Sequence, residues 1–124
     1  MIIKHKYRFL VLLILMIIGF FQHSCLKPDI SPRMEIKVIN AAGDAVRGAY
    51  VSLFENIDEW GMQKNPMQVW KETNDDGKVL FIGLSEIVYY FYITKDNLDN
   101  SDGYISIEEP LMKNKVVIIE VTIN

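Results

Sequence analysis

From Met34 onward, apolar and polar residues alternate along the chain with a period of two. Met34, Ile36 and Val38 would lie on one face of a strand, with Glu35 and Lys37 on the other. Residues 74–77 (Asn-Asp-Asp-Gly) are a strong turn signal, because these residue types tolerate the left-handed backbone conformation. No stretch has a convincing helical period. The pattern is typical of an antiparallel β-sandwich, with short strands expected at residues 34–38, 49–54, 67–72, 79–82, 87–94, 104–107 and 115–123.

The last of these expected strands differs from the others, because its centre is apolar on both faces. Residues 116–119 read Val-Val-Ile-Ile. A strand with one solvated face would alternate apolar and polar residues, whereas a strand buried on both faces is continuously apolar. We therefore expect residues 115–123 to form a central or covered strand.

Residues 1–24 have the pattern of a secretory signal peptide. A basic segment from Lys4 to Arg8 precedes an apolar run from Phe9 to Phe21. As a helix this run would span roughly 20 Å, whereas the hydrocarbon core of a bilayer is about 30 Å thick. The run is short for a transmembrane helix, although an uncleaved signal anchor is the alternative interpretation.

Cys25 follows a small residue, Ser24, at the end of this leader. The arrangement resembles the lipobox of bacterial lipoproteins, in the relaxed form of Bacteroidetes-type bacteria. The resemblance implies cleavage before Cys25 and lipid attachment to it, which would anchor the chain to the outer membrane. A plain secreted protein with one unpaired cysteine is the alternative. Residues 25–33 would then be a lipidated cysteine followed by a flexible, proline-containing tether, and residues 34–124 the folded domain.

The charge and composition of the part after the leader exclude several classes of function. Residues 25–124 hold all 16 acidic residues but only 10 of the 13 basic ones, so their net charge is −6. This charge opposes the binding of nucleic acids, which needs a basic face. Both histidines lie in the leader and Cys25 is the only cysteine, which excludes Ser-His-Asp and Cys-His catalytic sites, zinc sites with these ligands, and an internal disulfide. We therefore expect neither a cofactor nor enzymatic activity.

Three segments in sequence order resemble carboxypeptidase regulatory-like domains. Residues 38–53 (VINAAGDAVRGAYVSL) are similar to their opening motif, residues 73–84 (TNDDGKVLFIGL) to their second motif, and residues 89–95 (YYFYITK) to the aromatic strand that follows. The resemblance implies a transthyretin-like (prealbumin-like) fold, an all-β, seven-stranded antiparallel Greek-key β-sandwich. It also implies a non-catalytic accessory role, although a fold does not by itself define a function.

Aromatic residues suggest a binding surface on one face of this sandwich. If Ala49, Val51 and Leu53 point inward, the alternate residues of their strand point outward, and the same parity applies to the strand around Phe91 and Ile93. An exposed platform for a sugar or a protein partner is one interpretation, and ordinary cross-strand pairing of aromatic rings is the other. The residues expected on this face are Tyr50, Phe54, Trp70, Tyr90 and Tyr92, with Trp60 as an alternative contact.

Other candidate sites match their motifs poorly. Residues 98–109 align with an EF-hand calcium loop at several positions, but Leu98 stands where the first carboxylate ligand is required. We therefore favour an Asx-rich turn over calcium binding for this acidic loop (residues 96–109). Lys37 is the only first-strand candidate for the Lys–Asn isopeptide bond of CnaB-type relatives of this fold, and its parity places it on the solvent side. The adjacent acid pairs 58–59, 75–76 and 108–109 lie in or beside expected turns, without the cleft that a glycosidase needs.

Together these observations predict a non-enzymatic lipoprotein, anchored through Cys25, with a single β-sandwich domain for adhesion or protein interaction. The alternative is a carbohydrate-binding module that uses the aromatic face.

Overall fold

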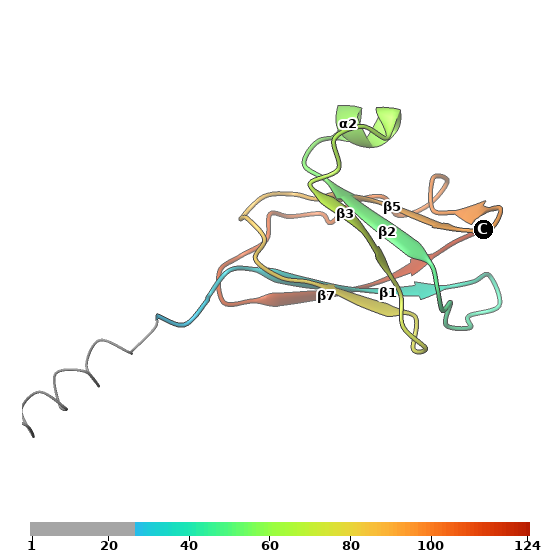
Figure 1. The fold of residues 1–124 in the computed structure, drawn as a ribbon, viewed down its shortest axis with the longest axis horizontal. Helices are drawn as coiled ribbons and strands as arrows, with labels where there is room; N and C mark the ends of the chain where they lie inside the picture. The colour runs from blue at the N-terminus through green and yellow to red at the C-terminus, as the bar shows by residue number, and fades with distance from the viewer. Residues whose placement is uncertain (1–26) are drawn as a thin grey trace, which may run out of the picture.

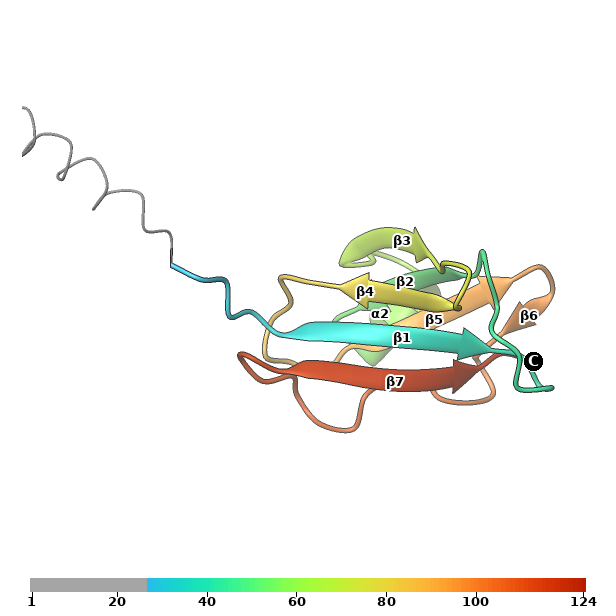
Figure 2. The same ribbon diagram turned by 90° about the horizontal axis from the view of Figure 1, so that it is seen from below.

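The computed structural model describes residues 27–124, without the side chains of Gln68 and Val69. The expected signal peptide and Cys25 lie outside the described residues. Within residues 27–124, no helix is long and apolar enough to cross a membrane. The described chain forms two β-sheets that face each other (Figures 1 and 2). The described chain is mostly β, and the expected β-sandwich is therefore confirmed.

The first sheet has the strand order β4-β1-β7, formed by Lys78–Phe81, Arg33–Ile39 and Val116–Thr122. β1 pairs with β4 antiparallel, but it pairs with β7 in parallel along its whole length. The expectation of an antiparallel sandwich is thus wrong for this one pair. Almost the entire domain lies between β1 and β7 in sequence, so no tight turn forces them to run in opposite directions.

The second sheet has the order β3-β2-β5-β6, and all of its pairs are antiparallel. Its strands are Gln68–Glu72 (β3), Tyr50–Phe54 (β2), Tyr90–Lys95 (β5) and Leu98–Asp99 (β6). The pairing of β3 with β2 shifts register between Val51 and Leu53. This shift shortens the regular part of the β3 edge.

The core lies between the two sheets and follows the predicted parity. Met34, Ile36 and Val38 of β1 are fully buried, as are the inward residues of β2 and β5. Their interior positions confirm the period-two alternation expected from the sequence. The other buried members of the cluster are Ala49, Val51, Leu53, Val79, Phe81, Leu84, Tyr89, Phe91, Ile93, Ile107, Leu111, Val121 and Ile123.

A helix that the sequence pattern did not predict, α2 (Ile57–Met62), follows β2. Asn56 caps it, because its side-chain oxygen accepts a hydrogen bond from the Glu59 N–H at 2.8 Å. Asp58 and Glu59 in the first turn are favourable at a helix N-terminus. The helix has only six residues, too few to show a helical period in the sequence.

The turn at residues 74–77 forms as predicted. The Asn74 side chain accepts hydrogen bonds from the N–H groups of Asp76 and Lys78, and Gly77 has a φ of +73°. A Cβ at Gly77 would lie 2.6 Å from the Val38 carbonyl oxygen. Glycine is therefore required both by the backbone conformation and by the space available.

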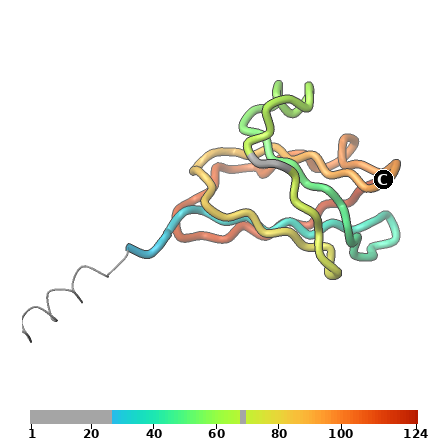
Figure 3. The backbone as a smooth tube through the Cα atoms, in the orientation of Figure 1, coloured from blue at the N-terminus to red at the C-terminus, as the bar shows by residue number. Residues whose placement is uncertain are grey.

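The segment expected as a strand at residues 104–107 is irregular. It makes a single bridge, from Ser106 to Tyr90. After β6 the chain runs back beside β5 and crosses to the other sheet near the start of β1 (Figure 3). It is held by scattered main-chain bonds, such as those from Phe91 N–H to Ile105 and from Leu111 N–H to Ile87. The long loop thus borders β5 without forming a regular strand.

Candidate functional site

Two of the predicted aromatic residues form an exposed pair on the outer face of the β3-β2-β5-β6 sheet. The rings of Tyr50 on β2 and Trp70 on β3 have centroids 4.6 Å apart and meet edge to face at 80°. Tyr50 is 41% exposed and Trp70 is 53% exposed. The pair offers a small aromatic contact surface rather than one flat platform.

Tyr90 and Tyr92 belong to the same face of the sheet but stand apart from this pair. Tyr92 lies opposite Ser52, and Tyr90 lies opposite Phe54 at the far end of β2. Both tyrosines are half-buried. Within the described chain, no ring-to-ring contact joins either of them to Tyr50 or Trp70. The four predicted residues therefore share a face, and within the described chain only the rings of Tyr50 and Trp70 pair with each other.

Part of this face is covered, which corrects the expectation for Phe54. Phe54 was expected to point outward and be exposed, yet it is only 1% exposed and is not part of the core cluster. The α2 helix lies on the outer side of the sheet and contacts β2 and β5 (Figure 1). Trp60 in α2 donates a hydrogen bond from Nε1 to the Phe91 carbonyl at 2.9 Å. Trp60 thus fastens the helix over this end of the sheet.

The acidic loop at residues 96–109 is organised around Asn100, which is buried. Its side-chain oxygen accepts a hydrogen bond from the Ile93 N–H at 2.8 Å. Its Nδ2 donates to the carbonyls of Phe91 at 3.0 Å and Tyr104 at 2.8 Å. The polar atoms of Asn100 therefore brace the loop against β5.

Asp99 of this loop makes a local contact. Asp99 accepts hydrogen bonds from the side chain and backbone of Ser101, and these bonds lower the pKa of Asp99 below its usual value. Over residues 27–124, no group of three or more acidic, histidine or cysteine side chains is placed to hold a metal ion. The three adjacent acid pairs lie apart, in α2, in the 74–77 turn and after Ile107, and Asp75 of the second pair binds Arg47 at 3.0 Å.

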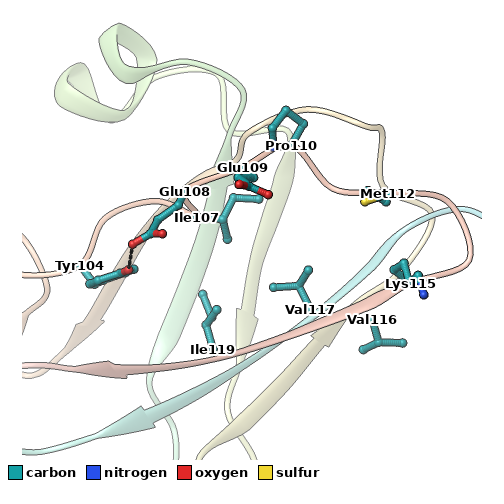
Figure 4. A pocket seen from close by; sticks show the side chains of 10 residues that line it. All are labelled: Tyr104, Ile107, Glu108, Glu109, Pro110, Met112, Lys115, Val116, Val117 and Ile119. Carbon is teal, nitrogen blue, oxygen red and sulfur yellow. Dashed lines mark hydrogen bonds between the residues drawn. The ribbon is translucent and has the colours of Figure 1, made fainter.

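An apolar groove along β7 was not anticipated from the sequence. β7 is an edge strand, not the central or covered strand that was expected. Ile118 is 69% exposed and Val116 is 45% exposed, while Val117 and Ile119 are only half-buried. The groove has a volume of about 540 Å³ and lies between β7 and the segment 104–112 (Figure 4). Its lining residues are Tyr104, Ile107, Glu108, Glu109, Pro110, Met112, Lys115, Val116, Val117 and Ile119.

The polar rim of this groove is mainly acidic. Glu108 and Glu109 lie on the wall opposite β7, and Lys115 lies at one end (Figure 4). The Tyr104 hydroxyl donates to Glu108 Oε1 at 2.8 Å. This hydrogen bond, together with the negative charge of Glu108, raises the pKa of Tyr104.

The segment that precedes β1 is hydrogen-bonded to the residues just before β7. The Asn114 N–H donates to the Ile30 carbonyl at 2.7 Å, and the Arg33 N–H donates to the Lys115 carbonyl at 3.1 Å. Residues 30–33 are thereby held against the domain. The described chain therefore enters the domain on the side where β1 and β7 begin (Figure 2).

Comparison with known proteins identifies the fold but no family. No protein-family model matches the sequence, and no curated protein matches it. The pilus 2b backbone protein of group B streptococcus matches 74% of this chain and 40% of its own at 20% identity, with a TM-score of 0.51. A variant of BcpA, the major pilin subunit of Bacillus cereus, matches 74% of this chain and 28% of its own at 22% identity, with a TM-score of 0.50. This chain thus spans less than half the length of either pilus protein, and at these identities the likeness shows the β-sandwich fold alone.

A third solved structure has a lower similarity. A catechol 1,2-dioxygenase from Pseudomonas arvilla matches 80% of this chain and 54% of its own at 10% identity, with a TM-score of 0.42. That score is too low to support an inference about this protein.

Proposed function

We propose that the protein is a non-enzymatic lipoprotein of the outer membrane, whose β-sandwich serves as an adhesion or protein-interaction module. The observation that carries the proposal is the fold, which is similar to segments of two pilus subunits. This domain also leaves large apolar side chains exposed, as a protein-interaction surface does.

The anchor is supported by the order of the N-terminal segments. A basic stretch, an apolar run and Ser24-Cys25 precede a short tether and the domain. Diacyl attachment at Cys25 would add more than one acyl chain, which is enough for stable membrane binding.

The anchor is tested by fractionating cells that express the full chain or its Cys25→Ser variant. The parent chain should enter the membrane fraction with an intact mass that fits cleavage before Cys25 plus lipid. The variant should retain its leader or leave the membrane. A Cys25→Ser chain that is normally cleaved and still membrane-bound would contradict lipidation.

The interaction role is tested by cross-linking surface amines of the full-length protein in intact cells. A protein-interaction module should give a discrete adduct that is heavier than the monomer. The matched control is the same cell type expressing the full-length protein with both candidate faces disrupted, Trp70→Ala with Ile118→Asp, which adds no amine. Failure of the parent chain to form any adduct would contradict the proposal.

A carbohydrate-binding module is the second candidate, favoured by the exposure of Tyr50 and Trp70. Exposed aromatic rings can stack on sugar rings. A glycan array should then show binding that is lost in Trp70→Ala and reduced in Tyr90→Ala. Binding unaffected by both substitutions would remove this candidate.

A further inference from the structure

The four strands at the edges of the two sheets are not equally protected against pairing with another strand. An edge strand exposes unpaired N–H and C=O groups that can pair with another chain. Proteins usually prevent this pairing with short edge strands, bulges or charged side chains. β6 has two residues, and β3 has a register shift. β4 has four residues, and Lys71 Nζ donates to its Leu80 carbonyl at 2.9 Å. Each of these three edges therefore has at least one protective feature.

β7 is neither short nor bulged, and Glu120 is its one charged residue. It has seven residues without proline, and its register with β1 is continuous. The carbonyl of Lys115 and the N–H of Ile123 bond to the β1 side, so the odd-numbered residues direct their main-chain groups toward β1. Alternation along a strand then directs the main-chain groups of every second residue toward the open edge. These outward residues are Val116, Ile118, Glu120 and Thr122.

The side chains around this edge suit an added strand. Val117 and Ile119 face the groove of about 540 Å³ (Figure 4), and Ile118 is exposed on the outer face. A strand paired with β7 would place alternate side chains in the groove and the others beside Ile118. β7 would then be a central strand of its sheet, as its continuously apolar sequence led us to expect.

The charge of the groove indicates the chemistry of the partner. Glu108 and Glu109 stand on its rim, against one lysine, Lys115, in the lining. Glu120, on the outer side of β7, lies opposite Lys37 of β1. A second copy would bring toward the first an identical acidic rim and the net charge of −6 that its residues 25–124 carry. Electrostatic complementarity therefore favours a basic segment over self-pairing.

We propose that β7 accepts an extended segment of a partner protein as an additional strand. The segment has apolar residues at alternate positions and carries basic residues that meet Glu108 and Glu109. This inference deepens the proposed protein-interaction function and rests on it.

The test uses full-length protein in detergent and short synthetic peptides as probes. The first peptide alternates valine and threonine with a lysine near each end. The second has glutamate in place of lysine, and the third has proline at two central positions, which removes main-chain donors. Binding affinity is measured by titration, and the site is located by amide hydrogen exchange.

We expect the lysine peptide to bind and to slow exchange at residues 116–122. The glutamate peptide should bind at least about fivefold more weakly because of the acidic rim, and the proline peptide at least about tenfold more weakly. Absence of binding by the lysine peptide, or slowed exchange only outside β7, would overturn the proposal.

Two substitutions distinguish pairing of the peptide with β7 from binding elsewhere on the domain. Ile118→Lys should lower the affinity of the lysine peptide at least about fivefold, because an edge lysine opposes pairing and repels the basic probe. Leu80→Lys is the matched control, since Leu80 is also exposed on an edge strand of the same sheet, and it should leave binding unchanged. Equal effects of the two variants would overturn the assignment to β7. If the peptides fail while adducts still form in cells, the interaction function stands and the β7 site is wrong.

Discussion

Replacing Asn100 with alanine removes the side chain that holds the acidic loop on β5. Asn100 is 1% exposed. It makes three hydrogen bonds to main-chain groups, at 2.8 Å to Ile93, 3.0 Å to Phe91 and 2.8 Å to Tyr104. Alanine would leave the buried Ile93 N–H without this acceptor.

The size of the effect follows from these contacts. A hydrogen bond contributes about 1 kcal/mol net, and a buried group left without a partner costs about 1–3 kcal/mol. Because alanine also relieves the cost of ordering the asparagine, we expect Asn100→Ala to lower the free energy of unfolding by about 2–4 kcal/mol. The midpoint temperature should fall by at least about 8 °C for a domain of this size.

Thermal and urea unfolding of the full-length protein measure this loss, with Asn97→Ala at an exposed position of the same loop as the control. The control should stay within about 0.5 kcal/mol of the parent protein. A similarly small effect of Asn100→Ala would refute the bracing role. A midpoint that calcium raises in the parent protein but not in Asp102→Ala would instead identify the loop as a metal site.

Three further predictions concern Gly77 in the 74–77 turn, Thr73 just before that turn, and Tyr104 in the groove. Gly77→Ala should destabilise the fold by at least about 1 kcal/mol in urea unfolding, because alanine resists a φ of +73° and its Cβ would meet Val38; an unchanged midpoint would contradict this. Thr73→Val should cost about 1–3 kcal/mol in the same assay, since the Thr73 hydroxyl bonds two main-chain groups at 2.6 Å and 2.9 Å; a neutral result would refute it. The pKa of Tyr104 is raised in the folded state, because the Glu108 carboxylate favours the neutral phenol. The hydrogen bond between Tyr104 and Glu108 therefore stabilises the fold fully below the ordinary pKa of 10.0, and this stabilisation is lost as the pH rises through the raised pKa. Glu108→Gln should lower the pKa of Tyr104 in ultraviolet difference titrations, and identical titration curves would contradict the hydrogen bond.

The interior of the domain could be predicted from the sequence because strand parity is a local property. Alternation alone identified Met34, Ile36 and Val38 as buried. The same reasoning failed for Phe54, whose outward direction did not imply exposure. A cover such as α2 depends on a contact between segments, and six residues are too few to reveal it by period. The N-cap Asn56 followed by Asp58 and Glu59 was the signal that could have indicated the helix.

The groove could not be predicted because the order of strands in a sheet is not a local property. Residues 116–119 correctly indicated a strand that is apolar on both faces, but they did not indicate whether this domain itself covers both faces. In the structure β7 is an edge with Ile118 exposed. The arrangement of the aromatic residues could not be predicted either. Within the described residues, the rings of Tyr50 and Trp70 are in contact, whereas Tyr90 and Tyr92 lie elsewhere on the same face of the sheet.

Site-specific photo-cross-linking in intact cells tests the open β7 edge most directly. A photoreactive amino acid replaces Ile118 in one strain of the full-length protein and Leu80 in another, since both side chains are exposed on edge strands of one sheet. We predict a discrete partner adduct from position 118 that the lysine peptide competes away, and no such adduct from position 80. Adducts from position 80 alone, or adducts at 118 that persist in excess peptide, would contradict the account.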